Sequence, residues 1–218
     1  MRCSIQLAYL LLYNLLQFSG TTWIFANMTA RFLFFGRGAQ VGTFYSVGVI
    51  MSVCQLLSLL ELFHIADGIE KGQLFPRFVQ VMERNLLLFV VFVGQEEFQS
   101  QLIVCVQFYM WNILQLLRYP HNLLCLVGMP SSSTLWARYT LIIPVYVLSV
   151  LTEGISIWQA LPYFDSGIYS IQLHTGNFRY VLLAYLPLLA IASSVTVGFL
   201  LKQRKQQLDI WNKKLKRK

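Results

Sequence analysis

Charged residues are scarce in this sequence of 218 residues: they make up only 12% of it, against roughly 25% in an ordinary soluble domain. Apolar residues make up 56%, and the mean hydropathy is +0.58. A chain of this size has too little interior to bury so much apolar surface in water. The composition therefore excludes a disordered chain and almost any soluble domain, and it predicts a protein with several membrane-spanning segments.

Motifs for metal binding and for several common chemistries are also missing. The four cysteines show no Cys-x-x-Cys spacing, which favours free thiols over disulfides or metal ligands. The three histidines are far apart in the sequence and are interpreted as interfacial or loop residues: His64, His121 and His174. No Gly-rich phosphate loop, His-Glu-x-x-His or Gly-x-Ser-x-Gly motif is present. No metal site is therefore predicted, and phosphate-loop, zinc-protease and serine-hydrolase chemistry are set aside.

The positive charge of the chain is concentrated in its last residues. Residues 202–218 hold eight lysines and arginines and one acid, and so carry +7 of the formal net charge of +8. This pattern is typical of a basic tail beside a membrane, whereas a nucleic-acid-binding domain would place cations and aromatic residues on a folded face. Lys214 and Lys216 also resemble a dilysine retrieval signal of the endoplasmic reticulum. Attraction of the tail to anionic lipid is a compatible alternative.

Six apolar segments approach the roughly 20 residues that a bilayer-spanning helix needs. They show no period-two alternation, which a membrane barrel requires, and unpaired backbone groups cannot face lipid, so helices are expected. The predicted fold is all-α, with a six-helix transmembrane domain over residues 1–201 and a basic cytosolic tail over 202–218. The first segment also fits a cleaved signal peptide, but its apolar character continues through Trp23 and Phe25. The predicted spans are about 5–25, 43–65, 79–94, 101–118, 136–158 and 179–201.

The distribution of lysine and arginine in the short loops predicts the orientation of these spans. If the N-terminus is cytosolic, 14 cations lie on the cytosolic side and three on the opposite side, so both termini are expected to be cytosolic. The longest connection, 159–178, then lies on the far side, and Pro162 is expected to end the helix before it. A glycosylation motif at Asn27 lies so close to the first span that it is interpreted as an unused match.

Ionisable residues inside membrane spans are rare and costly, so each is a candidate for function. Those of the predicted spans are Glu61, Glu83, Arg84, Arg118, Arg138 and Glu153. Gln80 and Arg84 are four residues apart and share a helix face. Tyr146 and Glu153 are seven residues apart, which places them on one face at about 10 Å along the axis. Such a pair can remove a proton beside a carbonyl and protonate a leaving group. A structural hydrogen bond between helices, for example from Arg84 to Glu153, remains an open alternative.

The order and spacing of these residues resemble a known family over nearly the whole chain. The matching positions are Leu60–His64, Gln80 with Arg84, Trp111 followed by Arg118-Tyr119, and Arg138–Thr140 through Tyr146 to Glu153. The sequence is identified by them as similar to the very-long-chain 3-hydroxyacyl-CoA dehydratases, a family once called protein-tyrosine-phosphatase-like. Residues 25–29 and 95–97 most resemble its divergent fourth vertebrate branch.

The resemblance implies a six-helix protein of the endoplasmic reticulum that catalyses the third step of fatty-acid elongation. In that step water is removed from a (3R)-3-hydroxyacyl-CoA to give the trans-2-enoyl-CoA. The family's catalytic pair falls on Tyr146 and Glu153; we expect Glu153 to act as the base and Tyr146 as the acid, with the reverse assignment open. The resemblance implies no metal or redox cofactor, and it implies contacts with elongases and reductases of the cycle. Supporting positions are Glu61, Gln80, Arg84 and Arg138, and the arginines at 84, 118 and 138 are expected to meet the CoA phosphates.

Three positions depart from the family pattern. Val147 stands where the family usually has proline, Ser149 where it has glycine, and Gln115 where it has an acid. Because Val147 and Ser149 flank the expected catalytic pair, they leave open a second hypothesis: a catalytically weak or inactive membrane adaptor that binds elongation enzymes. A small transporter is a third possibility, but the paired Gly/Pro-interrupted helices typical of transporter sites are not visible.

Overall fold

The computed structural model describes residues 2–70, 73–129, 131–166 and 178–215, and within these ranges the chain is helical apart from short turns, with no strand. The all-α prediction is confirmed. Each of the six predicted apolar segments falls on a helix or on helical segments that follow one another directly. The elements are α1 (Arg2–Phe35), η1 (Gly36–Gly42), α2 (Thr43–Ala66), α3 (Leu74–Leu86), the π-helical η2 (Leu87–Val93), η3 (Glu96–Ser100), α4 (Leu102–Leu126), α5 (Ser132–Trp136), the π-helical η4 (Ala137–Leu141), α6 (Ile142–Ser166) and α8 (Phe178–Leu215).

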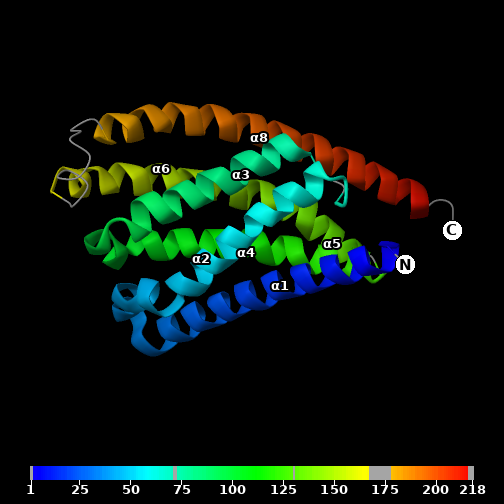
Figure 1. The fold of residues 1–218 in the computed structure, drawn as a ribbon, viewed down its shortest axis with the longest axis horizontal. Coiled ribbons are helices and arrows are strands. Elements are labelled where there is room, and N and C mark those ends of the chain that lie inside the picture. The colour runs from blue at the N-terminus through cyan, green and yellow to red at the C-terminus, as the bar shows by residue number, and fades with distance from the viewer. Residues whose placement is uncertain (1, 71–72, 130, 167–177, 216–218) are drawn as a thin grey trace.

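The two ends of the chain lie at the same end of the bundle. Helix α1 begins and α8 ends there, and the turns that follow α2 and α4 lie at that end as well (Figure 1). Gly68 and Gly128 form these two turns with φ of 69° and 81°, a left-handed conformation that glycine adopts without steric cost. The helices therefore cross the length of the molecule in alternating directions.

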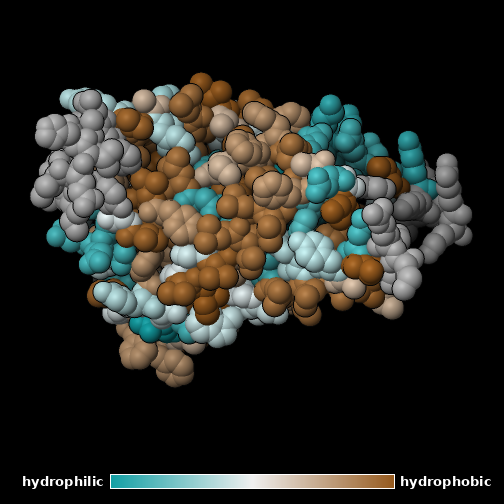
Figure 2. Space-filling model, in the orientation of Figure 1, coloured by the Kyte–Doolittle hydropathy of each residue, from teal (hydrophilic) through white to brown (hydrophobic). Residues whose placement is uncertain are grey.

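Three helical segments of the described chain are long and apolar enough to cross a membrane: Gly38–Ala66, Ser132–Phe164 and Arg179–Trp211. Their outward side chains are apolar, as shown by Val49, which is 76% exposed, and Ile191, which is 64% exposed. Hydrophobic residues cover most of the middle of one face of the molecule, and hydrophilic ones gather toward its ends (Figure 2). An apolar belt of this kind is what contact with lipid requires, because exposed apolar area of such extent is unfavourable in water.

An aromatic cluster forms the centre of the core. The ring of Phe92 in η2 lies 5.8 Å from that of Phe108 and 5.9 Å from that of Trp111, both in α4, and 6.1 Å from that of Phe98. All four side chains are fully buried. Ring pairs at these separations stabilise the packing by about 0.5–1.5 kcal/mol each beyond their buried area. The cluster fixes α4 against η2 and holds the Trp111 ring in place.

Pro162 was expected to end its helix, and this is wrong, because α6 continues through it to Ser166. Pro162 lies on the exposed face of α6, where the hydrogen bond that proline removes is not surrounded by packed neighbours. Helix α1 contributes Ile24 and Met28 to the core. The backbone of Lys214 belongs to the last turn of α8, while Lys216 lies outside the described residues.

Candidate active site

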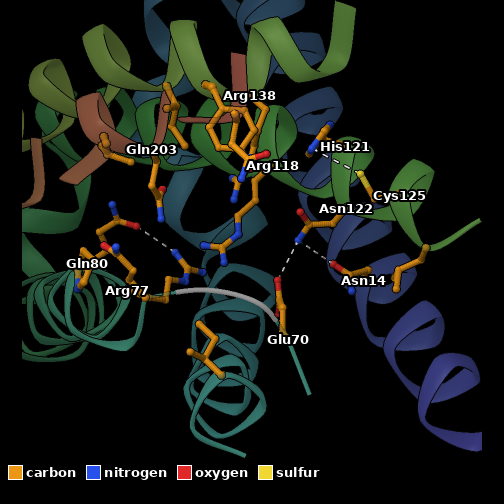
Figure 3. A pocket seen from close by; sticks show the side chains of 18 of the residues that line it. Asn14, Glu70, Arg77, Gln80, Arg118, His121, Asn122, Cys125, Arg138 and Gln203 are labelled. Atoms are coloured by element: carbon orange, nitrogen blue, oxygen red, sulfur yellow. Dashed lines mark hydrogen bonds between the residues drawn. The ribbon is translucent and has the colours of Figure 1, made fainter. Parts of the chain in front are cut away.

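A cavity of about 660 Å³ opens among α1, α3, α4, η4 and α8, at the end of the bundle where both chain termini lie. Its wall combines apolar side chains with three arginines and one glutamate, so cationic groups outnumber acidic ones along it. Figure 3 shows the arginines pointing inward from three different segments of the chain. The charged lining residues are Glu70, Arg77, Arg118 and Arg138.

Glu61 of α2 lies behind this wall and joins two of its arginines. The Glu61 carboxylate accepts hydrogen bonds from Arg77, with the Arg77 Nε 3.0 Å from Oε2, and it forms an ion pair with Arg118. The Glu61 side chain is only 1% exposed. One buried carboxylate thus holds the guanidinium groups of α3 and α4 side by side, and the group of three carries a net charge of +1.

The opposite wall of the cavity is built on amide groups. Asn122 donates hydrogen bonds to Glu70 and to Asn14, each at 3.4 Å (Figure 3). Glu70 lies in the turn between α2 and α3, and burial raises the pKa of its carboxyl, an effect opposed by the nearby Arg77 and Arg138. Because three arginines face this one acid along the wall, the cavity favours anionic ligands.

Arg138 has unused hydrogen-bonding capacity directed at the cavity. It belongs to the π-helical η4, six residues before Pro144, whose missing N–H is compatible with the irregular backbone before it. Its Nε and Nη1 atoms are buried and have no hydrogen-bond partner among the described residues. Buried guanidinium donors are normally satisfied, so these atoms mark a position where an anion would bind.

A small void of about 10 Å³ continues the cavity toward the middle of the bundle. It shares Arg77, Gln80 and Arg118 with the cavity wall, and it is lined on its inner side by Arg84 and Tyr146. A space of this size holds no more than about one water molecule. Tyr146 therefore lines a small space that shares wall residues with the arginine-lined cavity.

The hydroxyl of Tyr146 is bonded to Glu83, an ionisable candidate of the predicted span 79–94 to which the sequence assigned no role. Tyr146 Oη donates to Glu83 Oε1 at 3.1 Å and lies 3.5 Å from Oε2. Tyr146 is 1% exposed and Glu83 is 4% exposed. Glu83 precedes Arg84 in α3, so this helix places a carboxyl group and a guanidinium group in the same region of the core.

Glu153 has a separate set of partners. Its Oε1 accepts hydrogen bonds from Trp111 Nε1 at 2.9 Å, from Ser149 Oγ at 3.1 Å and from Gln107 Nε2 at 3.2 Å. Three donors directed at one oxygen stabilise the ionised carboxylate. The site therefore presents an oriented carboxylate and, on the same helix, a phenol that is bonded to a second carboxyl.

The structure brings most of the predicted residues into this region, in two groups. Glu61, Gln80, Arg118 and Arg138 gather at the cavity, while Arg84, Tyr146 and Glu153 lie deeper. Tyr146 and Glu153 share a helix but bond to different neighbours, and the alternative hydrogen bond from Arg84 to Glu153 is not found in the described part of the chain. The residues that sequence reasoning missed are Arg77 and Gln107; of these, only Arg77 had a signal, since it precedes Gln80 by one helical turn. Glu83 is one of the ionisable candidates of the predicted spans, but the sequence assigned it no role.

The two departures beside Tyr146 do not disrupt the site. Val147 is 40% exposed and points away from the core. Ser149 is fully buried, and its hydroxyl donates to Glu153 while accepting from Gln107 at 3.2 Å. Ser149 thus adds a donor that glycine lacks. The serine at this position therefore gives no support to the hypothesis of an inactive adaptor.

Comparison with known proteins connects this geometry to a family. A family model described as "Protein tyrosine phosphatase-like protein, PTPLA" matches residues 55–210. The chain is 45% identical over 214 residues to human very-long-chain (3R)-3-hydroxyacyl-CoA dehydratase 4, covering 96% of this chain and 92% of the relative. It is 45% identical over 204 residues to the Xenopus laevis very-long-chain (3R)-3-hydroxyacyl-CoA dehydratase, covering 91% and 94%.

More distant relatives share the same region. Mouse very-long-chain (3R)-3-hydroxyacyl-CoA dehydratase 3 is 35% identical over 213 residues, which cover 95% of this chain and 59% of the relative. No solved structure matches the chain. The resemblance inferred from the spacing of polar residues is confirmed: the chain belongs to the protein tyrosine phosphatase-like (PTPLA) family, which includes proteins named very-long-chain (3R)-3-hydroxyacyl-CoA dehydratases.

Proposed function

We propose that this protein removes water from very-long-chain (3R)-3-hydroxyacyl-CoA to give the trans-2-enoyl-CoA, the third step of fatty-acid elongation. The relatives' names supply the reaction class. The observation that carries the proposal is the presence of Tyr146 and Glu153, both buried on α6, inward of an arginine-lined cavity. A hydroxyl group and an oriented carboxylate are the two groups that an elimination beside a thioester needs.

The chain crosses the membrane six times in this proposal, with both termini cytosolic. The alternating direction of α1, α2, α3 with η2, α4, α6 and α8, and the shared end of both termini, support an even number of passes (Figure 1). The excess of lysine and arginine at that end supports a cytosolic orientation. Under this topology the cavity opens toward the cytosol, where the charged CoA head of the substrate is hydrated.

The cavity receives the phosphates of the CoA head. Arginine forms strong, charge-assisted hydrogen bonds with phosphate, and the unpartnered Nε and Nη1 atoms of Arg138 supply donors at the wall. Arg77 and Arg118 add positive charge that Glu61 only partly balances. The head thus binds at the wide end, and the thioester is directed inward past Gln80 toward Tyr146.

The chemistry follows from the two environments on α6. Glu153, held as a carboxylate by three donors, removes the proton from C2, which the thioester carbonyl makes acidic. Tyr146 protonates the hydroxyl at C3 as the C3–O bond breaks, and water leaves. The thioester itself stabilises the negative charge, so the reaction needs no redox cofactor. Because the void beside Tyr146 is about 10 Å³, the side chains around it must separate when the acyl chain enters.

The assay that tests this function uses the full chain in lipid nanodiscs. We expect the wild-type protein to convert a long-chain (3R)-3-hydroxyacyl-CoA to the trans-2-enoyl-CoA, measured by product chromatography, and Tyr146→Phe to lower kcat by about 10²-fold. The phenylalanine keeps the packed ring and removes only the proton donor. An inactive wild-type chain that still binds elongases would favour the adaptor, and equal rates for wild type and variant would exclude Tyr146 as the acid.

Arg138→Ala tests the assignment of the cavity to the CoA head. Loss of one charge-assisted phosphate contact is expected to raise KM about tenfold with little change in kcat. Lys205→Ala removes the same charge from an exposed position of α8 that does not line the cavity, and it should leave both constants unchanged. If both variants raise KM equally, the effect comes from general charge and not from the cavity.

We further propose residence in the endoplasmic reticulum membrane beside the elongases and reductases of the cycle. The dilysine pattern of Lys214 and Lys216 supports retrieval to that membrane. The substrate also argues for such neighbours, because the preceding reaction must reduce a 3-ketoacyl-CoA and the following one must reduce the enoyl-CoA, and both compounds stay in the membrane.

A further inference from the structure

Glu83 is a buried acid that the proposed reaction does not yet use. Its carboxyl belongs to α3, and both of its oxygens lie within 3.5 Å of the Tyr146 hydroxyl. One oxygen is therefore placed to accept the phenolic proton while the other is placed to return one. Glu83 is 4% exposed and Tyr146 is 1% exposed, so both are separated from bulk water. Protons exchanged by Tyr146 must therefore pass through its direct neighbours.

The charges around Glu83 do not balance two ionised carboxyl groups. Arg84 interacts electrostatically with both Glu83 and Glu153, while Arg77 is already bonded to Glu61. Two buried carboxylates beside one uncommitted guanidinium repel each other, and such pairs share a proton. The titratable or charged groups that face Glu83 come from three helices: Arg77 and Arg84 of α3, Tyr146 and Glu153 of α6, and Tyr185 of α8.

We propose that Glu83 is a positioning residue for Tyr146, which holds the phenol in place and returns a proton to it during turnover. The inference rests on the proposed dehydration. It assigns Glu83 to the acid side of the reaction and Glu153 to the base side, so the two carboxyl groups carry one proton between them at the start and at the end of each cycle.

The proton balance closes without another reactant. Glu153 begins ionised and takes the proton from C2, and the electron pair of the C2–H bond forms the new double bond. Tyr146 gives its proton to the departing hydroxyl, which leaves as water with the C3–O electron pair. Protonated Glu83 then reprotonates the phenolate, leaving Glu83 ionised and Glu153 protonated. Movement of one proton from Glu153 to Glu83 through the released water restores the starting state.

Glu83→Gln separates this role from a structural one, because glutamine accepts the same hydrogen bond but cannot return a proton. We expect kcat to fall at least about tenfold while KM stays near the wild-type value. In the Tyr146→Phe background the same substitution should have almost no further effect, because residues that act through one another are not additive. Glu96→Gln, an exposed acid of η3, is the matched control and should behave as wild type.

The outcomes distinguish this inference from the function on which it rests. An active wild-type protein with an equally active Glu83→Gln variant overturns the role of Glu83 alone. Additive losses in the double variant also overturn it, because they would mean that Glu83 acts independently of Tyr146. A wild-type protein that forms no enoyl-CoA overturns both the dehydration and the inference. A drop in kcat that disappears in the Tyr146→Phe background supports it.

Discussion

We expect Glu153→Gln to lower kcat for enoyl-CoA formation by about 10³-fold, because the base that removes the C2 proton is lost. The glutamine oxygen can still accept hydrogen bonds from Trp111, Ser149 and Gln107, which converge on one oxygen of the native side chain. The packing of α4 against α6 should therefore survive, and KM should change little. The measurement is a single-turnover assay in nanodiscs, which reports the chemical step separately from product release.

A second variant weakens the hydrogen bonding of Glu153 without removing its carboxylate. Trp111→Phe removes the donor at 2.9 Å but keeps an aromatic ring in the cluster, so the carboxylate remains with two donors. We expect a loss of about tenfold, smaller than that of Glu153→Gln, since one hydrogen bond to a charged group contributes about 1.5–3 kcal/mol. A Glu153→Gln variant with wild-type single-turnover rates would contradict the assignment of the base, and it would exclude Glu153 as the acid of the reverse assignment as well.

The helices of this protein were predictable because hydropathy alone specifies them. Six apolar runs predicted six positions, and each falls on helical chain. The extent of the helices was less predictable. Helix α6 continues through Pro162, and α8 extends without a break into the basic tail as far as Leu215. In both places the local signal, a proline or a change to charged residues, predicts a boundary that the continuous backbone does not have.

The site was predictable only where spacing along one helix determined it. Gln80 with Arg84, and Tyr146 with Glu153, follow from helical periodicity. The partners of these residues do not, because they come from other helices: Glu83 reaches Tyr146 from 63 positions away, and Trp111 reaches Glu153 from 42 positions away. Sequence spacing gives the face of a helix on which a residue lies, whereas packing between helices decides which faces meet.

The ion group behind the cavity gives the largest expected effect on stability. Glu61→Gln removes the negative charge between Arg77 and Arg118, both of which are at most 10% exposed. The two guanidinium groups then face each other without a counter-charge, and loss of one member of a buried ion group costs about 3–5 kcal/mol. We expect the free energy of unfolding in detergent to fall by that amount, measured by denaturant titration followed by far-UV circular dichroism.

Replacing the whole group distinguishes stability from binding. In the triple variant Glu61→Leu, Arg77→Met, Arg118→Met no buried charge is left unpaired, and apolar replacements of complete buried ion groups are often neutral or stabilising. We expect stability to return close to that of the wild type, while KM for the acyl-CoA remains high because two cations have left the cavity wall. If the triple variant recovers both stability and KM, the arginines serve only the fold. Recovery of stability alone means that the chain retains a costly buried ion group because the anionic head of its substrate requires those cations.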